Sequence, residues 1–137
     1  NGEKEISFEN QLKKYNSKIN FFYFKYDLTN LETLKGKKIY AFAGIGNPEN
    51  FFTALENKKL NIVMKRSFPD HYKYSDYEIS KMIDLAKKKD AILLTTEKDH
   101  CRINDKYNSK IFFSSIRIDL NDKSKFIDIL KKLYEKN

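Results

Sequence analysis

Cysteine, tryptophan, proline and glycine are all scarce in this sequence of 137 residues, which has one, none, two and four of them respectively. The single cysteine, Cys101, excludes an internal disulfide and suits a reducing compartment. No apolar run approaches the roughly 20 residues that a membrane-spanning helix needs, so we expect no transmembrane segment. The Walker A pattern, Gly-x-x-x-x-Gly-Lys-Ser/Thr, is also missing, and with it the usual loop that cradles nucleotide phosphates.

Hydrophobic residues make up 40% of the sequence and aromatic residues 15%, which is too apolar for a disordered chain despite 34% charged residues. The formal net charge of +8 favours polyanionic neighbours such as nucleic acid, anionic lipid or phosphorylated small molecules. The longest lysine run, 87–89, falls at the end of a predicted helix, where cations are stabilised. We therefore interpret this run as a helix-end feature rather than a binding patch.

Strand-like and helical segments alternate along the chain. Runs rich in β-branched and aromatic residues predict strands over 19–26, 38–43, 60–68, 91–95 and 110–118. Helices are expected from Pro48, from the capping-box pair Ser75 and Glu78, over 97–103, and after Asn121 or Asp122. This alternation predicts an α/β fold, with a mostly parallel sheet flanked by helices in a Rossmann-like lobe. We expect residues 1–18 to be a polar, partly mobile lead-in and residues 19–137 to be a single α/β domain.

Three polar clusters each follow directly behind a predicted strand. They are Gly44-Ile45-Gly46-Asn47-Pro48, Pro69-Asp70-His71-Tyr72 and Thr95-Thr96-Glu97-Lys98-Asp99. In an open parallel sheet, the carboxyl ends of neighbouring strands meet at one edge, and such folds bind ligands there. We therefore expect the three clusters to converge along this edge and to form a site.

Each cluster also has a structural interpretation. Gly44 and Gly46 are reminiscent of a phosphate-cradling turn, but Glu49 stands where a dinucleotide fingerprint needs a third glycine, so a tight strand-to-helix turn is favoured. His71 could serve as a base, an acid or a carboxylate-orienting donor, whereas a lone histidine in a loop is more often solvated. Asp70 is a poor candidate for orienting His71, because adjacent side chains in an extended turn point apart.

The third cluster has the composition of a helix start, with Thr96 as N-cap and solvated Glu97 and Asp99 in the first turn. Metal ligation by Glu97 and Asp99 is conceivable, but two carboxylates without further ligand spacing are weak evidence. Cys101 is expected to be a small buried hydrophobic residue on the helix that follows. The sequence therefore predicts no metal site.

Taken together, three blocks resemble the C-terminal half of the tetraacyldisaccharide 4'-kinase family. The blocks are AFAGIGNPENFFTAL (41–55), FPDHYKYSDYEI (68–79) and LLTTEKDHCRI (93–103). Departures from the family pattern are minor. Tyr72 stands where many members carry a second histidine, and His100 and Arg102 replace a small residue and a lysine.

The resemblance implies transfer of the ATP γ-phosphoryl group, with Mg²⁺, to the 4'-hydroxyl of an acylated disaccharide 1-phosphate in the lipid A pathway of Gram-negative bacteria. It implies a peripheral enzyme on the cytoplasmic face of the inner membrane, in contact with an anionic membrane surface and not with nucleic acid. The P-loop, the magnesium carboxylates and the catalytic aspartate belong to an N-terminal lobe that this sequence lacks, in cis or as a separate chain. The chain alone is therefore expected to be inactive, with neither ATP nor Mg²⁺ bound.

By the same resemblance, His71 hydrogen-bonds the base aspartate of the missing lobe and orients it. The resemblance places five residues near the interlobe cleft: Asp70, Thr96, Glu97, Lys98 and Asp99. Gly44, Gly46 and Asn47 form the turn at the strand end. An alternative is a non-catalytic α/β module that binds an anionic partner, phospholipid or nucleic acid, through its lysines. The aromatic run at 19–26 could then stack on bases, although a strand buried on both faces explains it more simply.

Overall fold

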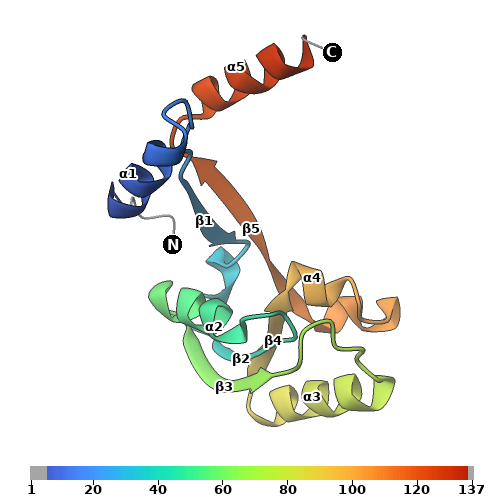
Figure 1. Cartoon of the computed structure of the whole chain (residues 1–137). Helices are drawn as coiled ribbons and strands as arrows, with labels where there is room; N and C mark the ends of the chain where they lie inside the picture. The colour runs from blue at the N-terminus through green and yellow to red at the C-terminus, as the bar shows by residue number, and fades with distance from the viewer. Residues whose placement is uncertain (1–5, 136–137) are drawn as a thin grey trace. The chain divides into compact units, whose positions relative to one another are not determined.

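The structure, a computed structural model, describes residues 6–135 and confirms the α/β class (Figure 1). A five-stranded sheet has the order β1-β5-β4-β2-β3, and the β2/β3, β2/β4 and β4/β5 pairs are parallel. The strands are β1 (Phe24–Thr29), β2 (Lys38–Ala43), β3 (Asn61–Ser67), β4 (Ala91–Thr96) and β5 (Phe112–Leu120). The helices are α1 (Ile6–Tyr15), α2 (Pro48–Asn57), α3 (Asp76–Lys88), α4 (Glu97–His100) and α5 (Lys123–Tyr134), with 3-10 helices η1 (Glu32–Leu34) and η2 (Asp105–Lys110).

The chain forms two compact units, which we describe separately. One unit runs from Leu28 to Ile116. The other consists of two segments, one that ends at Asp27 and one that begins at Arg117. The sequence predicts a different division, with a lead-in over residues 1–18 and one domain over residues 19–137. That division stays a prediction. Helix α1 occupies much of the expected lead-in. Within residues 6–135, no helix combines the length and the apolar character needed to cross a membrane.

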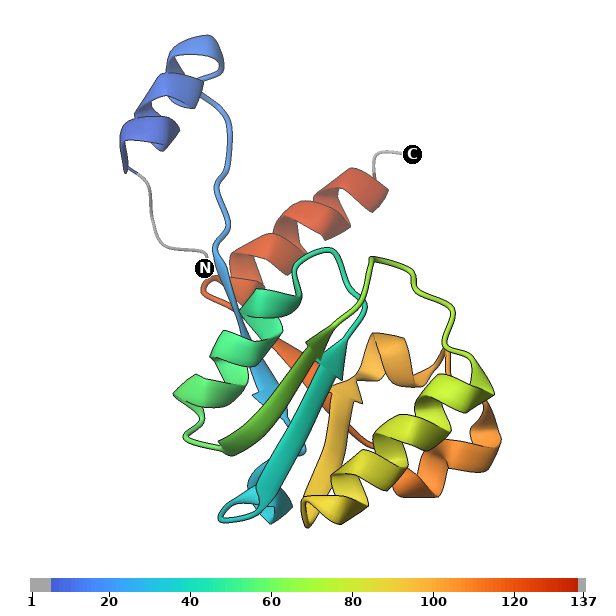
Figure 2. The same cartoon turned by 90° about the horizontal axis from the view of Figure 1, so that it is seen from below.

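Strand β2 is the centre of the unit from Leu28 to Ile116, because its alternate side chains enter two cores. Ile39 and Ala41 pack in the core that contains Phe51, Phe52 and Leu55 of α2. Tyr40 and Phe42 pack in the core that contains Ile79, Met82, Ile83 and Ala86 of α3. Figure 2 shows α2 (green) and α3 (yellow) on opposite faces of the strands between them. A strand covered on both faces is nearly all apolar, as the sequence predicts, and only Lys38 at the start of β2 is exposed.

The predicted helix starts in this unit are confirmed. Pro48 occupies the first turn of α2, where its missing N–H is not needed. Ser75 and Glu78 form the full capping box of α3. Helix α2 begins five residues after the end of β2, directly behind the glycine turn, whereas residues 68–75, which include the His71 cluster, separate the end of β3 from the start of α3.

The other unit is built around α1 and α5. Phe22 packs edge-on against Phe126 of α5, with ring centroids 5.1 Å apart, and the Tyr23 hydroxyl donates to Glu9 of α1. The strand predicted over 19–26 begins only at Phe24, and Phe24 and Tyr26 are 49% and 40% exposed. The prediction of a strand buried on both faces is therefore wrong, because the first aromatic residues of the run pack against helices instead.

Helix α5 follows Asp122 as predicted, although the Asp122 side chain makes no capping hydrogen bond. Four apolar residues of α5 are between 36% and 59% exposed: Phe126, Ile127, Leu130 and Leu133. Within the described residues, this helix therefore keeps an apolar face that is largely uncovered.

Candidate functional site at the carboxyl edge of the sheet

The three polar clusters meet at one edge of the sheet, as expected. Figure 2 shows the arrowheads of β2, β3 and β4 ending at the same edge. The backbone N–H of Gly44, after β2, donates to Oδ2 of Asp99 in α4 at 3.0 Å. The N–H of His71, after β3, donates to the carbonyl oxygen of Gly44 at 3.2 Å. Hydrogen bonds thus join the three clusters directly.

Asp99 is the centre of this network and is fully buried. Its Oδ2 accepts from the Gly44 N–H and from the Thr96 hydroxyl at 2.8 Å, and its Oδ1 lies 3.4 Å from Nη1 of Arg102. Thr96 caps α4 as predicted, because its Oγ1 accepts from the Asp99 N–H at 3.0 Å. The prediction that Asp99 is solvated is wrong, since its carboxylate turns back to satisfy the buried donor of Gly44.

The glycine turn is occupied by contacts within the protein. A Cβ atom at Gly44 would lie 2.7 Å from the Tyr74 hydroxyl and 3.2 Å from the Pro69 carbonyl oxygen, so the position needs glycine for packing. A Cβ atom at Gly46 would lie 3.4 Å from Oδ2 of Asp70. Asn47 caps α2 by accepting from the Asn50 N–H. The turn therefore does not fit a nucleotide phosphate, because the Gly44 N–H already donates to Asp99 and the Asp70 carboxylate next to Gly46 would repel an anion.

His71 is held at this edge in an uncommon conformation. Its φ is +58°, a region that few non-glycine residues adopt. The imidazole Nε2 lies 3.7 Å from Oδ2 of Asp70, and the His71 N–H donates to Oδ1 of the same carboxylate at 2.9 Å. The prediction that Asp70 points away from His71 is wrong, because the positive φ replaces the extended turn on which it depends.

Arg102 is a site residue that the sequence does not single out. Its Nη1 donates to the Gly44 carbonyl oxygen at 3.1 Å, and its Nη2 lies 3.3 Å from Nδ1 of His71. Arg102 follows Asp99 by three residues and is close to it through this local spacing. That spacing is the one signal in the sequence, but the contacts to Gly44 and His71 depend on the fold.

The remaining charged residues of the third cluster are exposed. Lys98 Nζ lies 3.8 Å from Oδ1 of Asp70, and both side chains are roughly half exposed. Ion pairs of this kind contribute little to stability. Glu97 is exposed in the first turn of α4. The predicted cleft residues thus divide into Thr96 and Asp99, which are buried and hold the edge together, and Asp70, Glu97 and Lys98, which face outward.

Aromatic residues support the segment that carries His71. Phe68, Tyr72 and Tyr74 contact one another, and Tyr74 also packs edge-on against Phe42 at 5.6 Å. The Tyr74 hydroxyl is buried without a hydrogen bond to the described residues. Its burial, together with the nearby Asp99 carboxylate, raises the Tyr74 pKa. A neutral phenol therefore covers Gly44.

Glu78 ties the same segment to α3. Its Oε2 accepts from the Ser75 hydroxyl at 2.7 Å and from the Ser75 N–H, and its Oε1 accepts from the Tyr72 hydroxyl at 2.7 Å. These hydrogen bonds, first those from Ser75 and then that from Tyr72, lower the pKa of Glu78 from 4.5 to about 2. The hydrogen bond to Glu78 also raises the pKa of Tyr72.

We expect this carboxylate to make stability depend on acid pH. Because the folded pKa is the lower one, the Glu78 contribution is complete above pH 4.5 and is lost as the pH falls towards about 2. Urea midpoints of the wild type and of Glu78→Gln, measured between these limits, should therefore converge as the pH falls. Parallel midpoints across the range would contradict this role of Glu78.

No metal or nucleotide site is formed by the described residues at this edge. Within residues 6–135, no three His, Cys, Asp or Glu side chains come together as a metal site would require. Asp99, one of the two carboxylates considered as metal ligands, has its oxygens occupied by protein donors. Cys101 is exposed, so its predicted burial is wrong. Residues that fit ATP or Mg²⁺ are therefore not found here.

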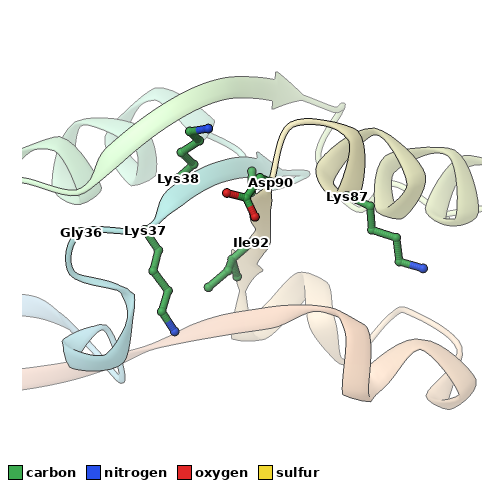
Figure 3. Close-up of a pocket in the computed structure, with 7 residues that line it drawn as sticks. Gly36, Lys37, Lys38, Lys87, Asp90 and Ile92 are labelled. Atoms are coloured by element: carbon green, nitrogen blue, oxygen red, sulfur yellow. The ribbon is translucent and has the colours of Figure 1, made fainter.

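A hollow of about 660 Å³ lies at the opposite edge of the sheet, at the amino ends of β2 and β4 (Figure 3). Its lining includes Lys37, Lys38, Lys87 and Asp90. Figure 3 shows the three lysine side chains pointing in different directions, with the Asp90 carboxylate among them. Dispersed cations around an acid do not make an anion cradle, so we place the candidate site at the carboxyl edge.

Comparisons with known proteins agree with one another. The family model of tetraacyldisaccharide-1-P 4'-kinase, LpxK, matches residues 2–135. The tetraacyldisaccharide 4'-kinase of Pelagibacter ubique is 37% identical over 138 residues, which cover all of this chain and 44% of that protein. The enzyme of the same name from Rickettsia typhi is 44% identical over 88 residues, or 64% of this chain and 27% of that protein.

A solved structure shares the fold. LpxK from Aquifex aeolicus, crystallised in complex with ATP, aligns with a TM-score of 0.57 and 20% identity over 88% of this chain and 40% of that one. At this identity the likeness concerns the fold alone. The chain spans less than half the length of these relatives.

Proposed function

We propose, from the premise that this chain belongs to the tetraacyldisaccharide-1-P 4'-kinase family, that it is the C-terminal lobe of such a kinase. The intact enzyme transfers the γ-phosphoryl group of ATP to the 4'-hydroxyl of an acylated disaccharide 1-phosphate in lipid A biosynthesis. This lobe contributes the edge that carries His71, and an N-terminal lobe contributes the nucleotide site. The two lobes belong to one polypeptide or to two chains that associate.

The observation that carries the proposal is the composition of the carboxyl edge. Phosphoryl transfer depends on a phosphate cradle, cations and a metal that position and neutralise the reacting groups. The edge offers an exposed histidine fixed by hydrogen bonds, but its glycine turn is filled by Tyr74 and Asp99. Such an edge can orient a catalytic group but cannot hold the phosphates. The cradle, Mg²⁺ and the base aspartate therefore belong to the other lobe.

In this arrangement His71 donates a hydrogen bond to the base aspartate of the N-terminal lobe. Its side chain is 72% exposed, so its outer edge is free to meet another part of the enzyme. Asp70, Glu97 and Lys98 are exposed beside it and line the interlobe cleft. Thr96 and Asp99 support the cleft from inside. Gly44, Gly46 and Asn47 have a structural role in the turn.

The apolar face of α5 supports the existence of a further part of the enzyme. Leu130 and Leu133 are about half exposed, which is costly for apolar side chains in water. The relatives are also more than twice as long as this chain. We therefore expect α5 to be covered in the intact enzyme.

The proposed location is the cytoplasmic face of the inner membrane, as a peripheral enzyme. The acceptor carries acyl chains, so it must be reached at a membrane surface. The net charge of +8 attracts the chain to anionic lipid headgroups. The same charge would serve the alternative function, a module that binds an anionic partner without catalysis.

The proposal predicts an all-or-none result in a transfer assay with radiolabelled ATP and the acylated disaccharide 1-phosphate. The chain alone should give no turnover, because it has no phosphate cradle. A joined protein, in which the N-terminal part of the Pelagibacter ubique relative precedes this chain, should be active. The control is that N-terminal part alone.

Two outcomes would contradict the proposal. One is turnover by the chain alone. The other is a joined protein that folds but is inactive. Binding of nucleic acid by the chain that weakens steeply with salt would then favour the binding module.

A further inference from the structure

We propose that Arg102 is a positioning residue that fixes the tautomer of His71, with the ring proton on Nε2. The catalytic consequence of this inference rests on the proposed function, whereas the tautomer itself does not. Arg102 is the side chain at this edge that contacts all three converging segments: the turn after β2, the His71 segment and α4.

The guanidinium of Arg102 is anchored by the protein. Its Nη1 donates to the carbonyl oxygen of Gly44 at 3.1 Å and lies 3.4 Å from Oδ1 of Asp99. Asp99 is fully buried, and the Arg102 side chain is only 21% exposed. The planar guanidinium group therefore has a fixed orientation, with Nη2 directed at the imidazole.

The contact between Arg102 and His71 determines the role of each ring nitrogen. Nη2 lies 3.3 Å from Nδ1. A guanidinium has only donors, so Nδ1 must accept and the proton of the neutral ring must sit on Nε2. The carboxylate of Asp70 lies 3.7 Å from Nε2 and can only accept. Both charged neighbours of the ring therefore favour the same tautomer.

The backbone keeps the ring in this place. The His71 N–H is shared between Oδ1 of Asp70 at 2.9 Å and the carbonyl oxygen of Gly44 at 3.2 Å. These two acceptors hold the residue at its positive φ. The ring is thereby pinned on its Nδ1 side while most of its surface stays exposed. At 3.7 Å the Asp70 carboxylate is beyond hydrogen-bond distance of Nε2, so the Nε2–H can still donate to an acceptor on the other lobe.

An outward Nε2–H is the form that a catalytic carboxylate on the other lobe requires. A carboxylate accepts a hydrogen bond from N–H, whereas the opposite tautomer would direct a ring lone pair at it. A histidine in the wrong tautomer is known to impair catalysis even when the geometry is intact. Arg102 thus acts through His71.

The tautomer is tested by ¹⁵N NMR on the chain of residues 1–137 at about pH 8.5, above the ordinary histidine range. His71→Gln identifies the His71 signals against those of His100. In the wild type and in Arg102→Lys, which keeps a donor, Nδ1 should resonate as an unprotonated nitrogen. In Arg102→Met the ¹⁵N chemical shift of Nδ1 should move towards the value averaged over the two tautomers. Arg102→Ala replaces Arg102→Met if the latter does not fold.

A protonated Nδ1 in the wild type would overturn the inference, as would an unchanged Nδ1 shift in the folded variant without a donor. The kinetic arm uses the joined kinase. Arg102→Met should lower kcat about 10–100-fold, the scale known for removing the hydrogen-bond partner that orients a metal-binding histidine. The KM for ATP should stay the same, and Arg102→Lys should restore most of the rate.

A double-mutant cycle separates this role from a structural one. In the His71→Gln background, Arg102→Met should cause no further loss of kcat. If Arg102→Met lowered kcat equally in the wild-type and His71→Gln backgrounds, the inference that Arg102 acts through His71 would be overturned. An inactive joined kinase would defeat the proposed function, while the NMR experiment would still decide the tautomer.

Discussion

Replacing Asp99 by alanine is expected to lower the free energy of unfolding by about 3–5 kcal/mol, the usual loss when one partner of a buried ion pair is removed. The Asp99 carboxylate is fully buried and accepts from the Gly44 N–H, the Thr96 hydroxyl and Arg102. Its removal leaves the buried Gly44 N–H and Thr96 hydroxyl without this acceptor and takes away the charge that pairs with Arg102. Urea unfolding of the chain, followed by circular dichroism, measures the loss.

Asp84→Ala is the matched control, because Asp84 is an exposed carboxylate on α3. It should change the free energy of unfolding by no more than about 0.5 kcal/mol. Asp99→Asn keeps one acceptor oxygen but loses the charge that faces Arg102. Its free energy of unfolding should therefore lie between those of Asp84→Ala and Asp99→Ala. A loss in Asp99→Ala as small as that in Asp84→Ala would show that the buried network does not hold the edge together.

The elements of the fold were largely predictable because their signals are local. The apolar run of β2 follows from its position between two layers of helix. Pro48 and the pair of Ser75 and Glu78 mark helix starts through backbone chemistry that needs no tertiary contact. The prediction of a strand over 19–26 is wrong for its first residues, because aromatic side chains pack equally well against helices and the sequence does not specify which neighbour they meet.

The convergence of the site was predictable from topology alone. Parallel strands end at a common edge, so clusters that follow β2, β3 and β4 had to meet. Whether each charged side chain is buried or exposed was not predictable, because burial depends on which residues from other segments pack against it. Asp99 and Glu97 are two residues apart in one short helix, yet one is fully buried and the other is exposed.

Arg102 and Asp70 show the same limit. The spacing from Asp99 to Arg102 brings these two residues together, but the contact with His71 joins segments that are 31 residues apart. The approach of Asp70 to His71 depends on the positive φ of His71, and a positive φ is not expected at a residue other than glycine. Tertiary hydrogen bonds select that conformation, and they are not encoded in local pattern.

In the joined kinase, His71→Ala is expected to lower kcat/KM by about 100-fold or more, the scale of a positioned acid–base group. On the proposed function, the base aspartate of the other lobe loses the donor that orients it, while the edge of the sheet stays intact. The imidazole is 72% exposed, so its removal leaves no buried cavity and should not unfold the lobe. Initial rates of phosphoryl transfer at several ATP concentrations measure the change.

If this chain completes a kinase active site through His71, as proposed, these rates depend on the imidazole and not on the opposite edge of the sheet. Lys87→Ala is the control, because Lys87 lies at the opposite edge of the sheet beside the hollow. The joined protein with Lys87→Ala should keep the wild-type rate, whereas His71→Ala should lose at least about 100-fold, mainly in kcat. Equal rates for His71→Ala and the wild type, with both proteins folded, would contradict the proposed role of His71.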